Sequence, residues 1–71
     1  MKFILFADRW VNSHHIISIR KGTSVKNFAQ VYLTLTNGIE YVEVFDDAGK
    51  GQYPATIYQE QRINQILNEL K

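Results

Sequence analysis

His14 and His15 are the first residues whose chemistry suggests a site, and the chain has no other histidine. Histidine is the commonest metal ligand and the usual acid–base group near neutral pH. Adjacent residues of a strand point to opposite faces, so these two imidazoles cannot bind one ion through regular backbone. We therefore expect a structural strand entry with one exposed and one packed imidazole. The alternative is a two-histidine metal site shared across a symmetric dimer.

Two later stretches share features with ion-binding or phosphate-binding loops. Asp46 and Asp47 lie near Gly49, but a calcium loop needs alternating Asp or Asn residues and a glutamate at its twelfth position. The segment Gly49-Lys50-Gly51 lacks the spacing of a phosphate-binding loop and the Ser or Thr that follows its lysine. We expect a solvated turn over residues 46–51.

Covalent catalysis has no candidate in this sequence. It contains no cysteine and no Gly-x-Ser-x-Gly elbow. A pocket of about 300 Å³ or more is also hard to build from one small sheet and one helix. We expect a protein that is not an enzyme and that binds no metal or cofactor.

Basic residues with an aromatic residue among them gather in the first half of the chain: Arg9, Trp10, Arg20, Lys21 and Lys26. Residues 1–36 carry five basic residues and one acidic residue, whereas residues 37–71 carry three basic and six acidic ones. Cations can bind phosphates while an aromatic ring stacks on bases, so this set is a candidate nucleic-acid patch. The net charge is only +1 and no helix-turn-helix, RNP or finger motif is present. We favour a solvated rim, with Trp10 in the core and with two oppositely charged halves that attract each other.

The length and composition indicate one small globular domain over residues 1–71. Without cysteine it has neither disulfides nor thiolate zinc sites, and a core of this size supplies only about 3–5 kcal/mol. Self-association, as a dimer, is one way to add stability.

The apolar run of residues 3–7 is too short for a signal peptide, and no run is long enough to span a membrane. We expect a cytoplasmic protein without a membrane partner.

The elements that position these residues follow from the hydrophobic pattern. Residues 2–7 form a short run that is apolar on both faces, which predicts a buried first strand. Residues 8–13 have no period and are expected to form a loop. Residues 15–20 alternate loosely and predict a second strand, and residues 21–27 predict a connecting loop.

The clearest local signal is Asn37-Gly38, between the β-rich runs 28–36 and 39–45. Asn-Gly accepts positive φ at both central positions of a type I′ turn, the usual two-residue hairpin loop. This loop pairs Thr36 with Ile39 and Val31 with Val44. One face then collects Val31, Leu33, Leu35, Val42 and Val44. The other collects Tyr32, Thr34, Thr36, Ile39, Tyr41 and Glu43.

The C-terminal segment predicts an amphipathic helix. Thr56 and Gln59 match a capping box, with Pro54 just upstream. An apolar stripe follows at helical spacing, formed by Ile63, Ile66, Leu67 and Leu70. We therefore predict an α+β fold in which a four-stranded antiparallel meander carries this helix on its valine-rich face.

The stretch from Val11 to Val44 resembles small bacterial proteins of the FlbD-like flagellar type. The shared motifs are the strand entry Asn12-Ser13-His14-His15-Ile16 and the hairpin Leu35-Thr36-Asn37-Gly38. The resemblance covers about half of the chain and implies the same architecture and a bacterial or phage origin. This sequence adds an acidic turn and a distinct first strand, so no functional residue is carried over.

The sequence favours a small regulatory or protein-interaction module that self-associates as a homodimer or binds another protein. Its candidate surface is the sheet face that the helix does not cover, which would be unusually aromatic for a solvated face. The interaction candidates are Tyr32, Thr34, Ile39 and Tyr41. The alternative is nucleic-acid binding through the basic and aromatic residues of the first half.

Overall fold

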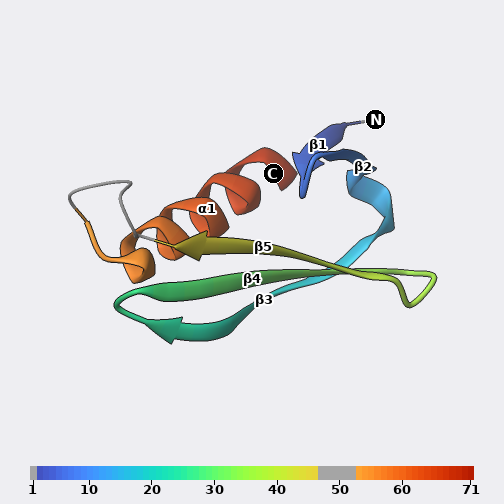
Figure 1. The fold of residues 1–71 in the computed structure, drawn as a ribbon. Helices are drawn as coiled ribbons and strands as arrows, with labels where there is room; N and C mark the ends of the chain where they lie inside the picture. Colours follow the sequence, from blue (N-terminus) through green and yellow to red (C-terminus); the bar gives the residue numbers. More distant parts are fainter. Residues whose placement is uncertain (1, 47–52) are drawn as a thin grey trace.

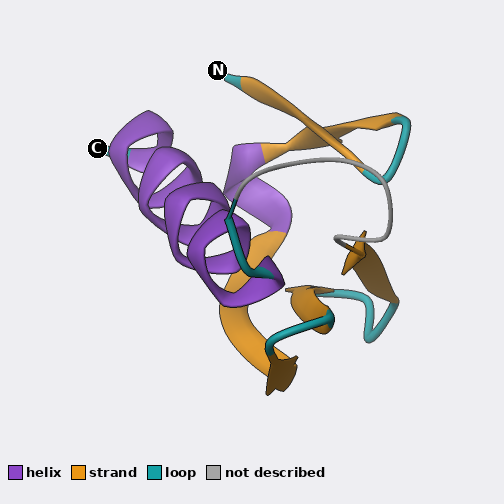
Figure 2. Ribbon diagram, turned by 60° about the vertical axis from the view of Figure 1, so that its left-hand side comes forward, coloured by secondary structure: helices purple, strands orange, loops and turns teal. Residues whose placement is uncertain are grey.

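The computed structural model describes residues 2–46 and 53–71. Its elements, in chain order, are β1 (Phe3–Phe6), β2 (Arg9–Asn12), the 3-10 helix η1 (Ser13–His15), β3 (Ile16–Val25), β4 (Phe28–Leu35), β5 (Glu40–Asp46) and α1 (Ala55–Leu70). β1 and β2 form a hairpin, and β3, β4 and β5 form an antiparallel sheet in that order. The helix and the hairpin lie on the same side of this sheet (Figures 1 and 2).

The predicted α+β class, with one C-terminal helix on an antiparallel sheet, is confirmed. The predicted single four-stranded meander is wrong in its first half, because β1 pairs with β2 and not with the larger sheet. Residues 9–12, predicted as loop, form β2, and β3 continues to Val25 through a segment also predicted as loop. The turn predicted over residues 46–51 lies, beyond Asp46, outside the described residues.

A tight turn at Ala7-Asp8 closes the first hairpin. Phe6 pairs with Arg9, so the loop has two residues, and both have positive φ values of 51° and 62°. Positive φ at both positions defines a type I′ turn, in which Asn-Gly is the favoured pair. The left-handed conformation costs a non-glycine residue about 1–2 kcal/mol, so local sequence preference does not explain this turn.

The register between β4 and β5 corrects the predicted one by a single residue. Leu33 pairs with Tyr41 and Val31 pairs with Glu43. Leu35 donates its N–H to the Ile39 carbonyl at 2.9 Å, which leaves a three-residue loop over residues 36–38. Within this loop only Gly38 has a positive φ, of 87°. This is a three-residue hairpin ending in a left-handed glycine, not a type I′ turn.

A shift of one residue moves every side chain of a strand to the other face. Val42 and Val44 therefore lie on the outer face with 40% and 51% exposure, whereas the structure buries Val31 and Leu33 completely. Tyr41 and Phe45 replace the two valines on the side that carries the helix, where they pack against the core. The predicted face of five apolar residues is thus wrong for its β5 members.

The core joins the hairpin, the sheet and the helix. Its buried members are Ile4, Phe6, Val11, Val31, Leu33, Leu35 and Ile66. Of the predicted helical stripe, Ile66 is fully buried and Ile63 packs against the core, but Leu67 and Leu70 are 45% and 37% exposed.

The predicted capping box is absent, because Pro54 is the N-cap and no side chain caps the helix. The Ala55 N–H instead donates to the Lys26 carbonyl at 2.8 Å. Gln59, predicted as a cap partner, is fully buried and donates through Nε2 to the carbonyls of Gln30 and Thr23. Its side chain therefore fastens α1 to the sheet. Across the described residues, no helix has the length and apolar character needed to cross a bilayer.

Candidate functional site

The predicted interaction residues do not share one face. Tyr32 and Thr34 lie on the outer face of the sheet, where the Tyr32 ring occupies the space a side chain at Gly22 would need. The Arg20 guanidinium lies over the Tyr32 ring, 4.5 Å from its centroid. These contacts make Tyr32 part of a packed layer.

The same layer holds an exposed ion pair. Arg20 Nη2 lies 2.6 Å from Glu40 Oε2, which also accepts the Thr34 hydroxyl at 3.2 Å. The hydrogen bond from Arg20 lowers the pKa of Glu40 below its ordinary value, with a smaller contribution from the Thr34 hydroxyl. Thr34 is therefore also engaged within the chain.

Tyr41 faces the opposite side of the sheet, because the register differs from the predicted one. Its ring is partly buried, and the Arg9 guanidinium lies 4.6 Å from its centroid. Ile39 follows the hairpin loop and is 46% exposed. The structure thus separates Tyr41 from Tyr32, and the aromatic face predicted from them does not form.

The basic candidates are also spread over the molecule. Arg9 stacks on Tyr41, Arg20 pairs with Glu40 on the outer face, and Lys21 lies 3.7 Å from Glu60 of α1. Lys26 lies in the turn between β3 and β4, and Trp10 lies on the first hairpin. The structure does not bring these five residues together.

The two histidines lie in η1, and both are exposed, so the prediction of one packed imidazole is wrong. The Asn12 side chain accepts the His14 N–H at 2.9 Å and so starts this short helix. Within residues 2–46 and 53–71, no group of three His, Cys, Asp or Glu side chains could hold a metal ion.

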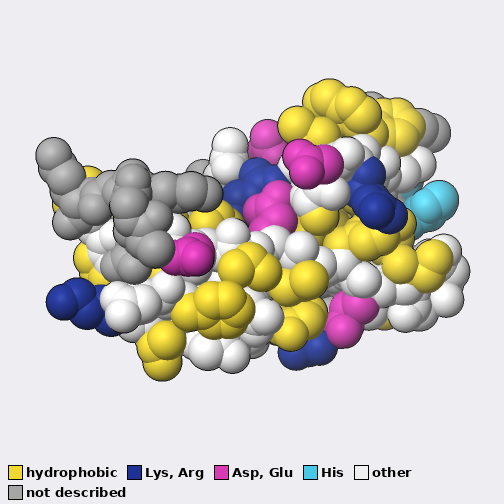
Figure 3. Space-filling model, viewed as in Figure 1, with side chains coloured by type: hydrophobic (Ala, Val, Ile, Leu, Met, Phe, Trp, Pro, Cys, Tyr) yellow, Lys and Arg dark blue, Asp and Glu magenta, His cyan; other side chains and the backbone are white. Residues whose placement is uncertain are grey.

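An exposed apolar surface covers the outer face of the β1–β2 hairpin; it is formed by Phe3, Leu5 and Trp10 and is called here the hairpin face. Trp10 is 68% exposed, Phe3 55% and Leu5 49%, and Leu5 pairs directly with Trp10 across the two strands. Figure 3 shows hydrophobic side chains gathered over this hairpin, with acidic side chains beside them. The prediction that Trp10 belongs to the core is therefore wrong.

Strand alternation explains why these side chains are exposed. Ile4 and Phe6 alternate with Phe3 and Leu5 and are buried, and Val11 does the same beside Trp10. The sequence pattern of β1 correctly indicated two apolar faces, but only one of them packs against the core. The other is left uncovered because the larger sheet lies on the opposite side of the hairpin.

Arg62 and Glu43 hold the hairpin against the rest of the protein. Arg62 Nε and Nη2 donate to the two Glu43 carboxylate oxygens at 2.8 and 3.1 Å, and Arg62 Nη2 also donates to the Leu5 carbonyl. Glu43 in turn accepts the Ala7 N–H at 2.9 Å. The pair is largely buried and links β5, α1 and the strained turn of the hairpin. We call these two residues the Arg62–Glu43 tether.

A hollow of about 340 Å³ separates the hairpin face from α1. The hairpin face forms one wall. The remaining lining residues are Asp8, Glu43, Arg62, Gln65 and Glu69.

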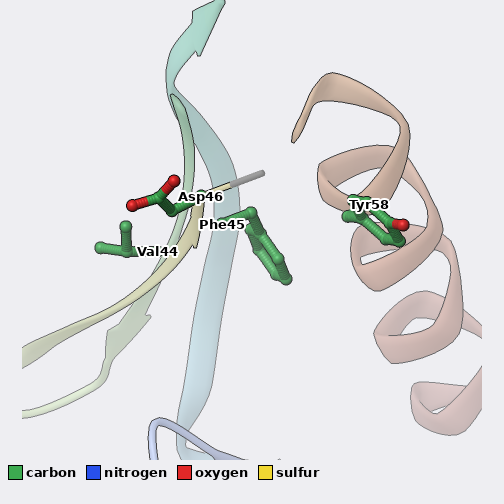
Figure 4. A pocket seen from close by; sticks show the side chains of 4 residues that line it. All are labelled: Val44, Phe45, Asp46 and Tyr58. Atoms are coloured by element: carbon green, nitrogen blue, oxygen red, sulfur yellow. The ribbon is translucent and has the colours of Figure 1, made fainter. Parts of the chain in front are cut away.

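A second hollow, of about 240 Å³, lies between the end of β5 and α1 (Figure 4). It is lined by Val44, Phe45, Asp46 and Tyr58, and Figure 4 shows Phe45 between the sheet and the helix that carries Tyr58. We assign no function to this hollow.

In comparisons with protein-family models, curated proteins and solved structures, nothing matched this chain. The functional argument therefore depends on the surface and its chemistry.

Proposed function

We propose that this chain is a small, non-enzymatic protein-interaction module that docks through the hairpin face. The observation that carries the proposal is the exposure of Trp10 beside Phe3 and Leu5. From these exposed fractions and the usual areas of aromatic side chains, the patch is on the order of 300 Å². Patches of this size often mark interaction sites, and Trp is among the residues enriched at binding hot spots.

The rigidity of the hairpin face supports the same proposal. A two-stranded hairpin alone is marginally stable in water, so a docking surface on it needs support. The inner side of the hairpin packs into the core through Ile4, Phe6 and Val11, and the Arg62–Glu43 tether fixes its turn. The hairpin face is thereby presented in a fixed shape, which limits the entropy lost on binding.

Affinity capture from an extract of the cells that make the protein tests this proposal. The wild-type chain, Leu5→Ser and Ile17→Ser are compared by mass spectrometry of the captured proteins. Ile17 is 63% exposed but lies on β3, so it is a matched control. We expect Leu5→Ser to lose specific partners that the wild type and Ile17→Ser retain. Identical captured sets for all three chains would contradict the proposal.

The homodimer expected from the sequence is one form that such docking could take. A stable interface buries about 800 Å² per partner, which is more than the hairpin face alone offers. Light scattering at high micromolar concentration measures this association directly. A strictly monomeric chain would rule out self-association and leave docking of a different protein.

Nucleic-acid binding has less support. Two of its five candidate residues, Arg20 and Lys21, form ion pairs with Glu40 and Glu60. A gel-shift experiment with DNA and RNA at low salt tests it, and binding that falls steeply with added salt would revive it.

A further inference from the structure

We infer that the hollow beside the hairpin face receives a lysine or arginine side chain from a partner protein, so that the partner segment is basic and apolar. This inference rests on the proposed docking function and names the chemistry of its partner. Three features carry it: an aromatic wall, two carboxylates that have no hydrogen-bond or ion-pair partner among the described residues, and a rim that does not suit a second copy of the chain.

The first feature is the wall. Phe3 and Trp10 both line the hollow and are more than half exposed. The faces of aromatic rings attract ammonium and guanidinium groups, and Trp does so most strongly. The aliphatic stem of a Lys or Arg side chain can also pack along Leu5 while its charged end stays in the hollow. One wall thus accommodates both parts of such a side chain.

The second feature is the charge of the other lining residues. Of the residues that the structure describes, four charged ones line the hollow: Asp8, Glu43, Arg62 and Glu69. Glu43 and Arg62 neutralise each other at 2.8 and 3.1 Å. Within the described part of the chain, the carboxylates of Asp8 and Glu69 have neither a hydrogen bond nor an ion pair. Among the described residues, the lining therefore carries two carboxylates that are in no ion pair.

Two cations beside this lining, Lys2 and Arg62, already donate hydrogen bonds within the chain. The Lys2 ammonium donates to the main-chain carbonyls of Glu69 and Lys71 at the end of α1, at 2.7 and 3.3 Å. Arg62 donates to Glu43, Gln65 and the Leu5 carbonyl. A cation from outside the chain would therefore add charge-assisted hydrogen bonds that residues 2–46 and 53–71 do not supply.

The third feature is the negative charge that Asp8 and Glu69 would present to a second copy of the chain. A symmetric dimer brings the same patch of both chains together. Asp8 and Glu69 would then face the acidic rim of the other copy, and like charges placed opposite each other in an interface are unfavourable. A basic partner would instead be attracted, because its positive charge complements these carboxylates. The observations thus favour a different, basic protein segment over self-association.

Three short synthetic peptides test the inference: alternating Leu and Lys, Leu and Gln, and Leu and Glu. Trp10 is the only tryptophan in the chain, so its emission reports directly on this wall. We expect the Lys peptide to shift the Trp10 emission to shorter wavelength and to bind at least about tenfold more tightly than the Gln peptide, a difference of about 1.4 kcal/mol. The Glu peptide should bind most weakly.

Two variants locate the binding. Glu69→Gln should lower the affinity for the Lys peptide severalfold. Glu60→Gln should leave that affinity unchanged, because Glu60 pairs with Lys21 and does not line the hollow. Equal affinity for the three peptides, or equal effects of the two variants, would overturn the inference. A homodimer that is abolished by Trp10→Ala would also overturn it, because the occupant would then be a second copy.

Failure of the inference can be distinguished from failure of the proposed function. If Leu5→Ser loses captured partners but the peptides bind equally, the hairpin face docks a partner of another chemistry. If Leu5→Ser captures the same proteins as the wild type, the docking function itself is wrong.

Discussion

Replacing Arg62 with alanine should loosen the first hairpin more than any exposed charge change would. In the wild type, this guanidinium makes two hydrogen bonds to Glu43, one to Gln65 and one to the Leu5 carbonyl. Its side chain is only 16% exposed and that of Glu43 only 20%. The substitution leaves a largely buried carboxylate that keeps one remaining partner, the Ala7 N–H.

The magnitude follows from these contacts. A hydrogen bond to a charged group contributes about 1.5–3 kcal/mol, and breaking a fully buried ion pair costs about 3–5 kcal/mol. Because this pair is partly accessible to water, we expect a loss of about 2–3 kcal/mol. In a domain of this size that lowers the melting temperature by roughly 10–20 °C.

Thermal and urea unfolding followed by circular dichroism measure this loss. The control is Lys21→Ala, which removes an ion pair whose N–O distance is 3.7 Å and whose two side chains are more than half exposed. An exposed pair contributes about 0–1 kcal/mol, so the control should change stability little. If Arg62→Ala and Lys21→Ala destabilise the protein equally, the Arg62–Glu43 tether does not hold the hairpin as described.

Three further predictions concern the fold. Gln59→Leu should cost about 2–3 kcal/mol in urea unfolding, because it removes the hydrogen bonds that this fully buried side chain makes to β3 and β4, whereas the same change at the exposed Gln61 should cost little. Asp8→Gly should raise the free energy of unfolding by about 0.5–1 kcal/mol, because glycine adopts the φ of 62° without strain, but it should lower the affinity for the Lys peptide. A loss of both stability and peptide affinity would contradict the turn assignment. Glu40 should titrate in an NMR experiment below its ordinary value of 4.5, and Arg20→Gln should return it toward that value. Because the pKa of Glu40 is lower in the folded chain than in the unfolded chain, the stability that the Arg20–Glu40 pair adds is present above pH 4.5 and is lost as the pH falls through the folded pKa. An unchanged titration midpoint of Glu40 in Arg20→Gln would refute the hydrogen bond from Arg20 as the cause.

The sequence predicted the second hairpin but not its register, and the reason is local. Gly38 takes a left-handed conformation both in a type I′ turn and in the three-residue loop that forms. The faces did not decide between the two, because β5 is apolar on both sides: Val42 and Val44 alternate with Tyr41 and Phe45. In the register that forms, Glu43 lies opposite the buried Val31 and faces the interior, where Arg62 neutralises it.

The first hairpin was missed because its turn has no recognisable signal. Ala7-Asp8 contains neither Gly nor Asn, and its conformation depends on tertiary contacts that include the Ala7 N–H bound to Glu43. Without that turn, residues 8–13 resemble a loop and Trp10 resembles a core residue. The candidate surface could not be predicted for the same reason, since it exists only when β1 and β2 pair.

The central claim is that the hairpin face is covered by a partner. Hydroxyl-radical footprinting of the chain, free and in the complex captured from cells, measures the accessibility of Trp10 directly. Trp10 is 68% exposed in the free chain, so it should oxidise readily there and be strongly protected in the complex, while Ile17 on β3 stays accessible in both. Equal oxidation of Trp10 in the two states, with protection appearing instead on the outer sheet face at Val42 and Val44, would contradict the claim.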